Sequence, residues 1–277
     1  MIQIAELKGF LESIRNTYGY DFTEYAEASV IRRITNFMKS NMMGSLQELG
    51  QLLLKNEETF ARFVQEFTVN VTEMFRDPAF YNSLREKVLK HLATYPVIKV
   101  WIAGCSTGEE VYSVAILLKE EGLLDRTMIY ATDINQRALQ AAKEGIFRIE
   151  LMKTYTANYQ KAGGKKSFSD YYTAKYNSAM IDKSLKQNIV FSVHNLAADS
   201  SFNEFQLILC RNVMIYFNQS LQNKVINLFY DSLSPFGFLG LGNKESLLFS
   251  DKQKEFTDVD KKEKIYRKEN MTRKVRP

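Results

Sequence analysis

A short loop of small residues is the first place where this sequence could bind a ligand. The loop 104–108 reads GCSTG, follows an apolar run at 98–103, and precedes two glutamates, Glu109 and Glu110. Glycine lets a backbone approach a ligand closely, and a loop of this kind at the start of a helix often holds a nucleotide. The two carboxylates would repel a phosphate, so the loop favours a ligand that carries none.

A second chemical feature lies at the end of the next predicted strand, where the run 127–132 is followed by Asp133. An acid at this position of a doubly wound fold hydrogen-bonds ribose hydroxyls. The dinucleotide fingerprint G-x-G-x-x-G is absent, because Gly104 and Gly108 are four residues apart. A nucleoside with a positive centre therefore fits better than NAD. S-adenosylmethionine, with its sulfonium and amino groups, is the obvious case.

Alternating strands and helices after residue 77 must position these groups. The predicted strands are 98–103, 127–132, 188–193, 205–210, 236–242 and 264–268, and the predicted helices between them are 109–121, 135–144 and 219–233. This order predicts an α/β fold with a doubly wound, mostly parallel, Rossmann-like sheet. Residues 149–187 interrupt this alternation of strands and helices, and we expect them to form a small inserted subdomain of helix and short strands.

Residues 1–68 predict a small all-helical N-terminal domain. Apolar residues recur at three and four spacing in 4–14, 25–38, 46–54 and 60–67. The pattern becomes extended at 69–77, so we expect a linker there and a second domain at 78–277. Asp77-Pro78 is expected to begin its first helix, with the aspartate as N-cap and the proline in the first helical position.

Composition indicates a cytoplasmic protein without a nucleic-acid partner. No apolar run approaches the ~20 residues of a membrane span, and the N-terminus does not resemble a signal peptide. Two cysteines and two histidines show no metal-ligand spacing, so no metal is expected. Residues 261–277 hold eight basic and two acidic residues, so the net charge of +5 is concentrated in a C-terminal tail. A localised tail of this kind is not a nucleic-acid-binding footprint.

Five motifs occur in an order that identifies a family. They are NVTEMFR at 70–76, AGCSTGEEVYSVA at 103–115, ATDIN at 131–135, HNL at 194–196 and CRNVMIYF at 210–217. Together they strongly resemble the CheR family, the chemotaxis receptor glutamate O-methyltransferases, over nearly the whole chain. Met74 stands where an aromatic residue is common and Val111 where proline is usual. Neither departure removes a polar contact.

The resemblance implies site residues. With Gly104 of the loop, the implied S-adenosylmethionine contacts are Asn70, Thr72, Arg76, Glu110, Asp133, Asn195, Leu196, Arg211 and Asn212. Glu110 would meet the methionine portion and Asp133 the ribose. Arg76 and Tyr216 would lie beside the transferred methyl group as catalytic residues. Without the resemblance, a linker arginine and a core tyrosine would be the simpler interpretations.

The implied reaction transfers a methyl group from S-adenosylmethionine to glutamate side chains of chemoreceptors, giving methyl esters and S-adenosylhomocysteine. A glutamate carboxylate, with a pKa near ~4.3, is already an anionic nucleophile at neutral pH. No general base is required, and catalysis should consist mostly of proximity and alignment. Arg76 can hold the incoming carboxylate and the Tyr216 hydroxyl can fix its geometry.

The expected partners are the cytoplasmic helices of chemoreceptors, met by a monomer that does not insert into the membrane. Arg32, Arg33 and Lys39 could form a basic docking strip on the helix at 25–43, although the sequence alone favours an ordinary solvated helix face. Some family members bind a receptor's C-terminal peptide through a glycine-bearing loop in the inserted subdomain. The corresponding segment 170–188 has no glycine, so a tight turn is less expected there. We therefore predict a tether-independent enzyme, one that does not need to bind the receptor's C-terminal peptide.

Other functions remain open at this point. A nucleic-acid methyltransferase lacks support because none of the four prolines adjoins another or precedes a cysteine. A nicotinamide oxidoreductase is disfavoured by the missing glycine and the paired glutamates. A non-catalytic S-adenosylmethionine-binding adaptor, or a methyltransferase for a non-chemotaxis signalling protein, stays as an alternative.

Overall fold

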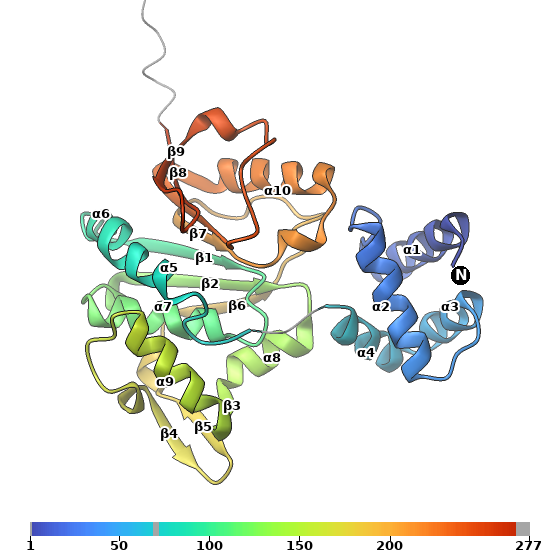
Figure 1. Cartoon of the computed structure of the whole chain (residues 1–277), viewed down its shortest axis with the longest axis horizontal. Coiled ribbons are helices and arrows are strands. Elements are labelled where there is room, and N and C mark those ends of the chain that lie inside the picture. Colours follow the sequence, from blue (N-terminus) through green and yellow to red (C-terminus); the bar gives the residue numbers. More distant parts are fainter. Residues whose placement is uncertain (1, 69–71, 270–277) are drawn as a thin grey trace, which may run out of the picture.

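A computed structural model describes residues 2–68 and 72–269. The N-terminal helices are α1 (Ile4–Tyr18), α2 (Glu27–Ser40), α3 (Leu46–Lys55) and α4 (Glu57–Phe67). They form a separate bundle in Figure 1, with a hydrophobic core of their own that includes Phe22, Phe37 and Phe63. Side chains cap two of these helices, since Ser45 Oγ accepts the Glu48 N–H at 3.1 Å and Asn56 Oδ1 the Thr59 N–H at 2.8 Å. Such caps satisfy amides that have no partner within the helix.

The larger unit is built on one seven-stranded sheet. Its strands are β1 (Ile98–Ala103), β2 (Thr127–Asp133), β6 (Ile189–Val193), β7 (Phe205–Cys210), β8 (Leu233–Leu241), β9 (Phe256–Asp260) and β10 (Ile265–Lys268). They lie in the order β6-β2-β1-β7-β8-β10-β9. The first five in that order run parallel, while β10 is antiparallel to both β8 and β9. The predicted mostly parallel, Rossmann-like sheet is therefore confirmed.

Both faces of this sheet are covered by helices (Figure 1). The helices are α5 (Pro78–Ser83), continued by a π-helical turn at Leu84–Leu89 and α6 (Lys90–Leu92), then α7 (Glu109–Glu120), α8 (Gln136–Glu144) and α10 (Gln219–Ser232). Strand β1 shows why helices must pack on both faces of the sheet. Ile98, Val100 and Ile102 belong to one core cluster, and Trp101 and Ala103 belong to the cluster on the other face. Side chains alternate across a strand, so an apolar strand requires packing on both sides.

The inserted subdomain contains β3 (Ile146–Arg148), α9 (Met152–Lys161), β4 (Tyr172–Lys175) and β5 (Ser178–Ile181). Its three strands form an antiparallel sheet in the order β3-β5-β4, below the main sheet in Figure 1. Glu120 of α7 anchors it by accepting hydrogen bonds from the Tyr171 hydroxyl at 2.9 Å and the Lys165 N–H at 3.0 Å. Glu120 also accepts from the Tyr159 hydroxyl and from Arg85.

Three local features differ from the sequence-based expectation. A tight turn does join β4 to β5 without glycine, because Tyr176 adopts a left-handed φ of 53°. Strand β9 was not predicted, since FTDVD is too polar to show a clear apolar alternation. The predicted basic tail begins within the β9–β10 hairpin, and of this tail the residues after 269 lie outside the described part of the chain.

The described helices include none that is both long and apolar enough to cross a lipid bilayer.

Candidate functional site

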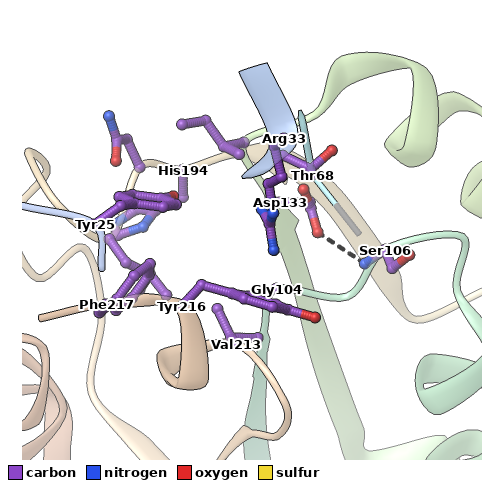
Figure 2. A pocket seen from close by; sticks show the side chains of 13 residues that line it. Tyr25, Arg33, Thr68, Gly104, Ser106, Asp133, His194, Val213, Tyr216 and Phe217 are labelled. Atoms are coloured by element: carbon purple, nitrogen blue, oxygen red, sulfur yellow. Dashed lines mark hydrogen bonds between the residues drawn. The ribbon is translucent and has the colours of Figure 1, made fainter. Parts of the chain in front are cut away.

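A cavity opens at the carboxyl ends of β1 and β2, between the sheet and the N-terminal helices (Figure 2). It encloses about 640 Å³, including its open mouth. Its lining residues are Tyr25, Arg33, Thr68, Gly104, Ser106, Asp133, Ile134, His194, Asn195, Leu196, Val213, Tyr216 and Phe217. The end of a parallel sheet is where α/β folds bind ligands.

Asp133 is the acidic group of the cavity. Its Oδ2 accepts the Ser106 N–H at 2.8 Å and its Oδ1 accepts the Asn135 N–H at 2.9 Å. Burial raises the pKa of Asp133, and these backbone donors oppose the rise. A carboxylate has about four acceptor positions, so further donors such as a pair of hydroxyls can still bind it.

Gly104 allows two loops to meet at the floor of the cavity. It has a left-handed φ of 74°, and a Cβ added there would lie 2.4 Å from Val213 Cγ2. No side chain fits at that distance, so glycine is required for the loop after β1 to touch the loop after β7. The Gly104 and Cys105 amides both donate to the Thr132 carbonyl, at 2.8 and 2.9 Å, which ties this loop to the end of β2.

The HNL motif forms another wall. Asn195 Oδ1 accepts the Ala197 N–H at 3.0 Å, which fixes the turn that places Leu196 at the cavity. His194 is 7% exposed, and its Nε2 lies 3.2 Å from the Ser200 carbonyl oxygen. Its Nδ1 has no hydrogen-bond partner among the described residues. His194 therefore lines the cavity as well as holding the turn that follows it.

Arg33 corrects the predicted docking strip. Arg32 and Lys39 are exposed, but Arg33 is only 7% exposed and lines the cavity. Its guanidinium carbon lies 4.2 Å from the centre of the Tyr216 ring, and its Nη1 donates to the Phe67 carbonyl. The physical reason is helical geometry, since neighbouring residues on a helix point about 100° apart and cannot share a face.

Two nitrogens of Arg33, Nε and Nη2, have no hydrogen-bond partner among the described residues. Burial lowers the pKa of Arg33, while the nearby Tyr216 and Tyr25 raise it. Figure 2 shows the Arg33 side chain above the Tyr216 ring. A buried arginine with open donors suits a carboxylate, which pairs with a guanidinium through charge-assisted hydrogen bonds.

The N-terminal helices close the cavity through contacts on two sides. On one side, the Ala26 N–H donates to the Tyr216 carbonyl and the Asn218 N–H to the Glu24 carbonyl, each at 2.9 Å. On the other side, Asn135 Nδ2 donates to Thr68 Oγ1 at 2.9 Å. The cavity is thus shared between both parts of the chain.

Several predicted site residues lie in a neighbouring ion-pair cluster instead of the cavity lining. Arg211 has a side chain 3% exposed and donates to Glu110 Oε1 and Asp77 Oδ2, each at 2.8 Å. It also donates to the Arg76 carbonyl at 3.2 Å, so it fixes the segment that carries Arg76. Asp77 does not act as the predicted side-chain N-cap, because its carboxylate binds Arg211, although Pro78 does begin the helix.

The two glutamates of the GEE motif also separate. Glu109 is 5% exposed and accepts from Thr107 Oγ1 of the loop at 2.6 Å and from the Tyr155 hydroxyl at 3.3 Å. Only Glu110 joins the cluster around Arg211. Both charges lie in the first turn of α7, as the sequence indicated, but they have different partners and neither residue lines the cavity.

The structure brings together part of the predicted site. The cavity lining includes the predicted residues Gly104, Asp133, Asn195, Leu196 and Tyr216. It does not include the predicted residues Thr72, Arg76, Glu110, Arg211 and Asn212. Asn70 lies outside the described residues. Sequence reasoning missed Tyr25, Thr68, Ser106, Ile134, Val213 and Phe217 as lining residues. Ser106, Ile134, Val213 and Phe217 fall within quoted motifs, which was the available signal. Tyr25 and Thr68 come from the helical domain, and no local pattern indicates them.

The cavity fits S-adenosylmethionine. A buried carboxylate with spare acceptor positions suits the ribose hydroxyls, and Leu196, Ile134 and Phe217 offer apolar walls for a purine. The partnerless His194 Nδ1 is a polar group that a bound ligand would satisfy. Asp133, Gly104 and Asn195 would hold the nucleoside.

Comparisons with known proteins agree with this fit. The family model described as CheR methyltransferase, SAM binding domain, matches residues 70–265, and the model of its all-alpha domain matches residues 5–68. A putative methyltransferase Cher3 of Pseudomonas putida is 48% identical, covering 95% of this chain and 96% of its own. A chemotaxis protein methyltransferase of Vibrio anguillarum is 30% identical, covering 89% and 90%, and one of Listeria innocua is 28% identical, covering 86% and 89%. The chain therefore belongs to the CheR methyltransferase family and is a methyltransferase that uses S-adenosylmethionine.

Proposed function

We propose that this enzyme methylates glutamate side chains on the cytoplasmic helices of chemoreceptors, giving glutamate methyl esters. The observation that carries the proposal is Arg33, a buried arginine with two partnerless nitrogens at the cofactor cavity. An arginine suits a carboxylate acceptor, whereas it would repel the ammonium group of a lysine. The names of the Vibrio and Listeria relatives, chemotaxis protein methyltransferases, support the receptor as the acceptor.

The chain's own residues have a modest chemical task. When bound, S-adenosylmethionine supplies an electrophilic methyl group on a sulfonium, so the cofactor provides the reactive centre. Asp133 orients the nucleoside, and the contact between Gly104 and Val213 shapes the floor. Arg33, stacked on Tyr216, would hold the acceptor carboxylate, which is ionised at neutral pH and needs no base. Closure by the N-terminal helices limits the access of water.

Receptor recognition is assigned to the exposed face of α2. Arg32 and Lys39 are exposed and seven residues apart, which places them two turns apart on one helix face. We propose that this two-residue docking strip faces acidic receptor helices. Arg33 contributes inside the cavity instead.

The test incubates the protein with methyl-labelled S-adenosylmethionine and a receptor cytoplasmic fragment. Label on the fragment that is released as methanol at alkaline pH is expected, because methyl esters hydrolyse in base while methylated amines do not. Base-stable label, or label on a receptor whose acceptor glutamates are replaced by alanine, would refute glutamate methylation. No transfer to any receptor, with S-adenosylhomocysteine binding intact, would favour the adaptor alternative or a non-chemotaxis acceptor.

A second arm of this assay addresses the tether. The tight turn at Tyr176 removes the structural premise of the tether-independent prediction, but the prediction itself still stands to be tested. A receptor fragment that lacks its C-terminal pentapeptide should be methylated at the same rate as the full fragment. Micromolar binding of the pentapeptide would contradict tether independence.

A further inference from the structure

A buried carboxylate outside the cavity lining, Glu245, holds one wall of the cavity in place. It is 5% exposed and lies just after β8. Its Oε1 accepts the N–H groups of Val213 at 2.9 Å and Met214 at 2.7 Å. Its Oε2 accepts those of Asn212 at 2.9 Å and Gly242 at 2.7 Å. Four backbone donors thus converge on one side chain.

The loop that Glu245 holds has a conformation that needs support. Asn212 adopts a left-handed φ of 62°, which is uncommon for residues other than glycine. Three successive N–H groups, from Asn212 to Met214, point to the same carboxylate. Successive amides in such a turn form a concave nest that binds an anion. Here a side chain of the same protein supplies the anion.

This loop connects Glu245 to the cofactor site. Val213 lines the cavity and touches the Gly104 position, where an added Cβ would lie 2.4 Å from Val213 Cγ2. Tyr216 follows in a short 3-10 turn, lines the cavity, and accepts the Ala26 N–H from the N-terminal helices. A shift of the 212–216 loop would therefore move the cavity floor and the closing contact together.

We propose that Glu245 is a positioning residue for the cofactor site. It fixes the 212–216 loop so that Val213 and Tyr216 form the wall against which S-adenosylmethionine binds. The proposal rests on the cavity being the cofactor site and not on the identity of the methyl acceptor. Its test therefore uses binding of S-adenosylhomocysteine, so that its failure leaves the glutamate proposal intact.

The first test variant is Glu245→Gln, in which an NH₂ group replaces one acceptor oxygen and faces two backbone donors. Dissociation constants for S-adenosylhomocysteine are measured by calorimetry at a temperature where circular dichroism shows folded protein. We expect binding to weaken by about tenfold or more, the cost of unsatisfied buried donors. The control Glu263→Gln alters another buried carboxylate, 7% exposed in the turn between β9 and β10, and should leave the affinity unchanged.

A second variant, Gly242→Ala, displaces the Glu245 carboxylate without removing it. The added Cβ would lie 2.7 Å from Glu245 Oε2 and 2.8 Å from the Asn212 nitrogen. Its control is Gly9→Ala on α1, where no atom outside its chain neighbours and the backbone of its own helix lies within 4 Å of the new Cβ. Weakened binding in Gly242→Ala supports the proposal even if Glu245→Gln fails to fold. Wild-type affinity in both folded variants, with only their melting temperatures lowered, would make Glu245 merely structural and overturn it.

Discussion

At the scale of single residues, the cofactor assignment depends most on Asp133. Its carboxylate ends β2, is oriented by the Ser106 and Asn135 amides, and has acceptor positions left for ribose hydroxyls. Asp133→Ala should weaken S-adenosylhomocysteine binding by about 1.5–3 kcal/mol, the range for a lost hydrogen bond to a charged group. Calorimetry measures this change. Asp170→Ala, at an exposed position, is the control, and equal affinities for both variants would remove the ribose assignment.

A second prediction at the scale of residues separates cofactor binding from alignment of the acceptor carboxylate. Arg33→Ala should lower receptor methylation by about tenfold to a hundredfold, since a charged hydrogen bond to the acceptor is lost, and leave S-adenosylhomocysteine affinity nearly unchanged. Lys55→Ala, at an exposed position of α3, is the control and should retain turnover. Arg76→Ala, measured alongside, tests the original assignment of the acceptor-holding role. Wild-type turnover in Arg33→Ala would exclude Arg33 from acceptor binding.

The sequence predicted some residues of this site and misplaced others, for physical reasons. Asp133 ends β2 and Gly104 directly follows the adjacent parallel strand β1, so the fold itself brings them together, and both were predicted. Arg33 was assigned to the surface because three cations on one helix resemble a solvated strip. Its burial depends on how α2 docks against Phe67 and Tyr216, which no local pattern in the sequence records.

At the scale of elements, Glu120 of α7 ties the inserted subdomain to the main sheet. Burial alone would raise the pKa of Glu120, but hydrogen bonds from Tyr159, Arg85, the Lys165 amide and Tyr171 lower it below its ordinary value of 4.5. A carboxylate with a lowered folded-state pKa stabilises the protein above its unfolded-state pKa and loses that contribution as pH falls through the folded-state value.

Glu120→Gln should therefore lower the melting temperature at pH 7, and the difference from wild type should shrink as the pH falls below about 4.5. Thermal denaturation followed at several pH values measures it. Glu150→Gln, at an exposed position of the same subdomain, should show no such dependence. A difference that grows on acidification would contradict the assigned role of Glu120.

The prediction about receptor recognition concerns the exposed face of α2. Replacing Arg32 and Lys39 with glutamate should abolish most receptor methylation, because an acidic receptor helix would be repelled. Wild-type methylation should fall with added salt, since exposed charges are screened over about 8 Å at physiological ionic strength. Affinity for S-adenosylhomocysteine, measured separately, should not change. Full methylation by the double variant would exclude the docking strip.

At the scale of the whole molecule, the alternation of strands and helices predicted the main sheet and its ligand edge. The central strands β1 and β7 are almost wholly apolar and buried, and glycine ends α7 and α8. Gly122 and Gly145 end α7 and α8 as expected, both with left-handed φ. The closing of the cavity by the N-terminal helices was not predicted. That closure depends on single contacts between distant segments, such as Tyr25 pairing with Phe217, which sequence spacing does not indicate.

The central claim is that one cavity between the two parts of the chain binds S-adenosylmethionine. Hydrogen–deuterium exchange with and without S-adenosylhomocysteine tests it most directly, because bound ligand protects the amides of the elements it contacts or closes. Protection is predicted at 104–108, 132–135, 194–197 and 212–217, and also at 22–33 of the N-terminal helices. Residues 246–266, around a separate surface pocket, should exchange as before. Protection confined to 246–266, or absent from the loops at 104–108 and 132–135, would contradict the account.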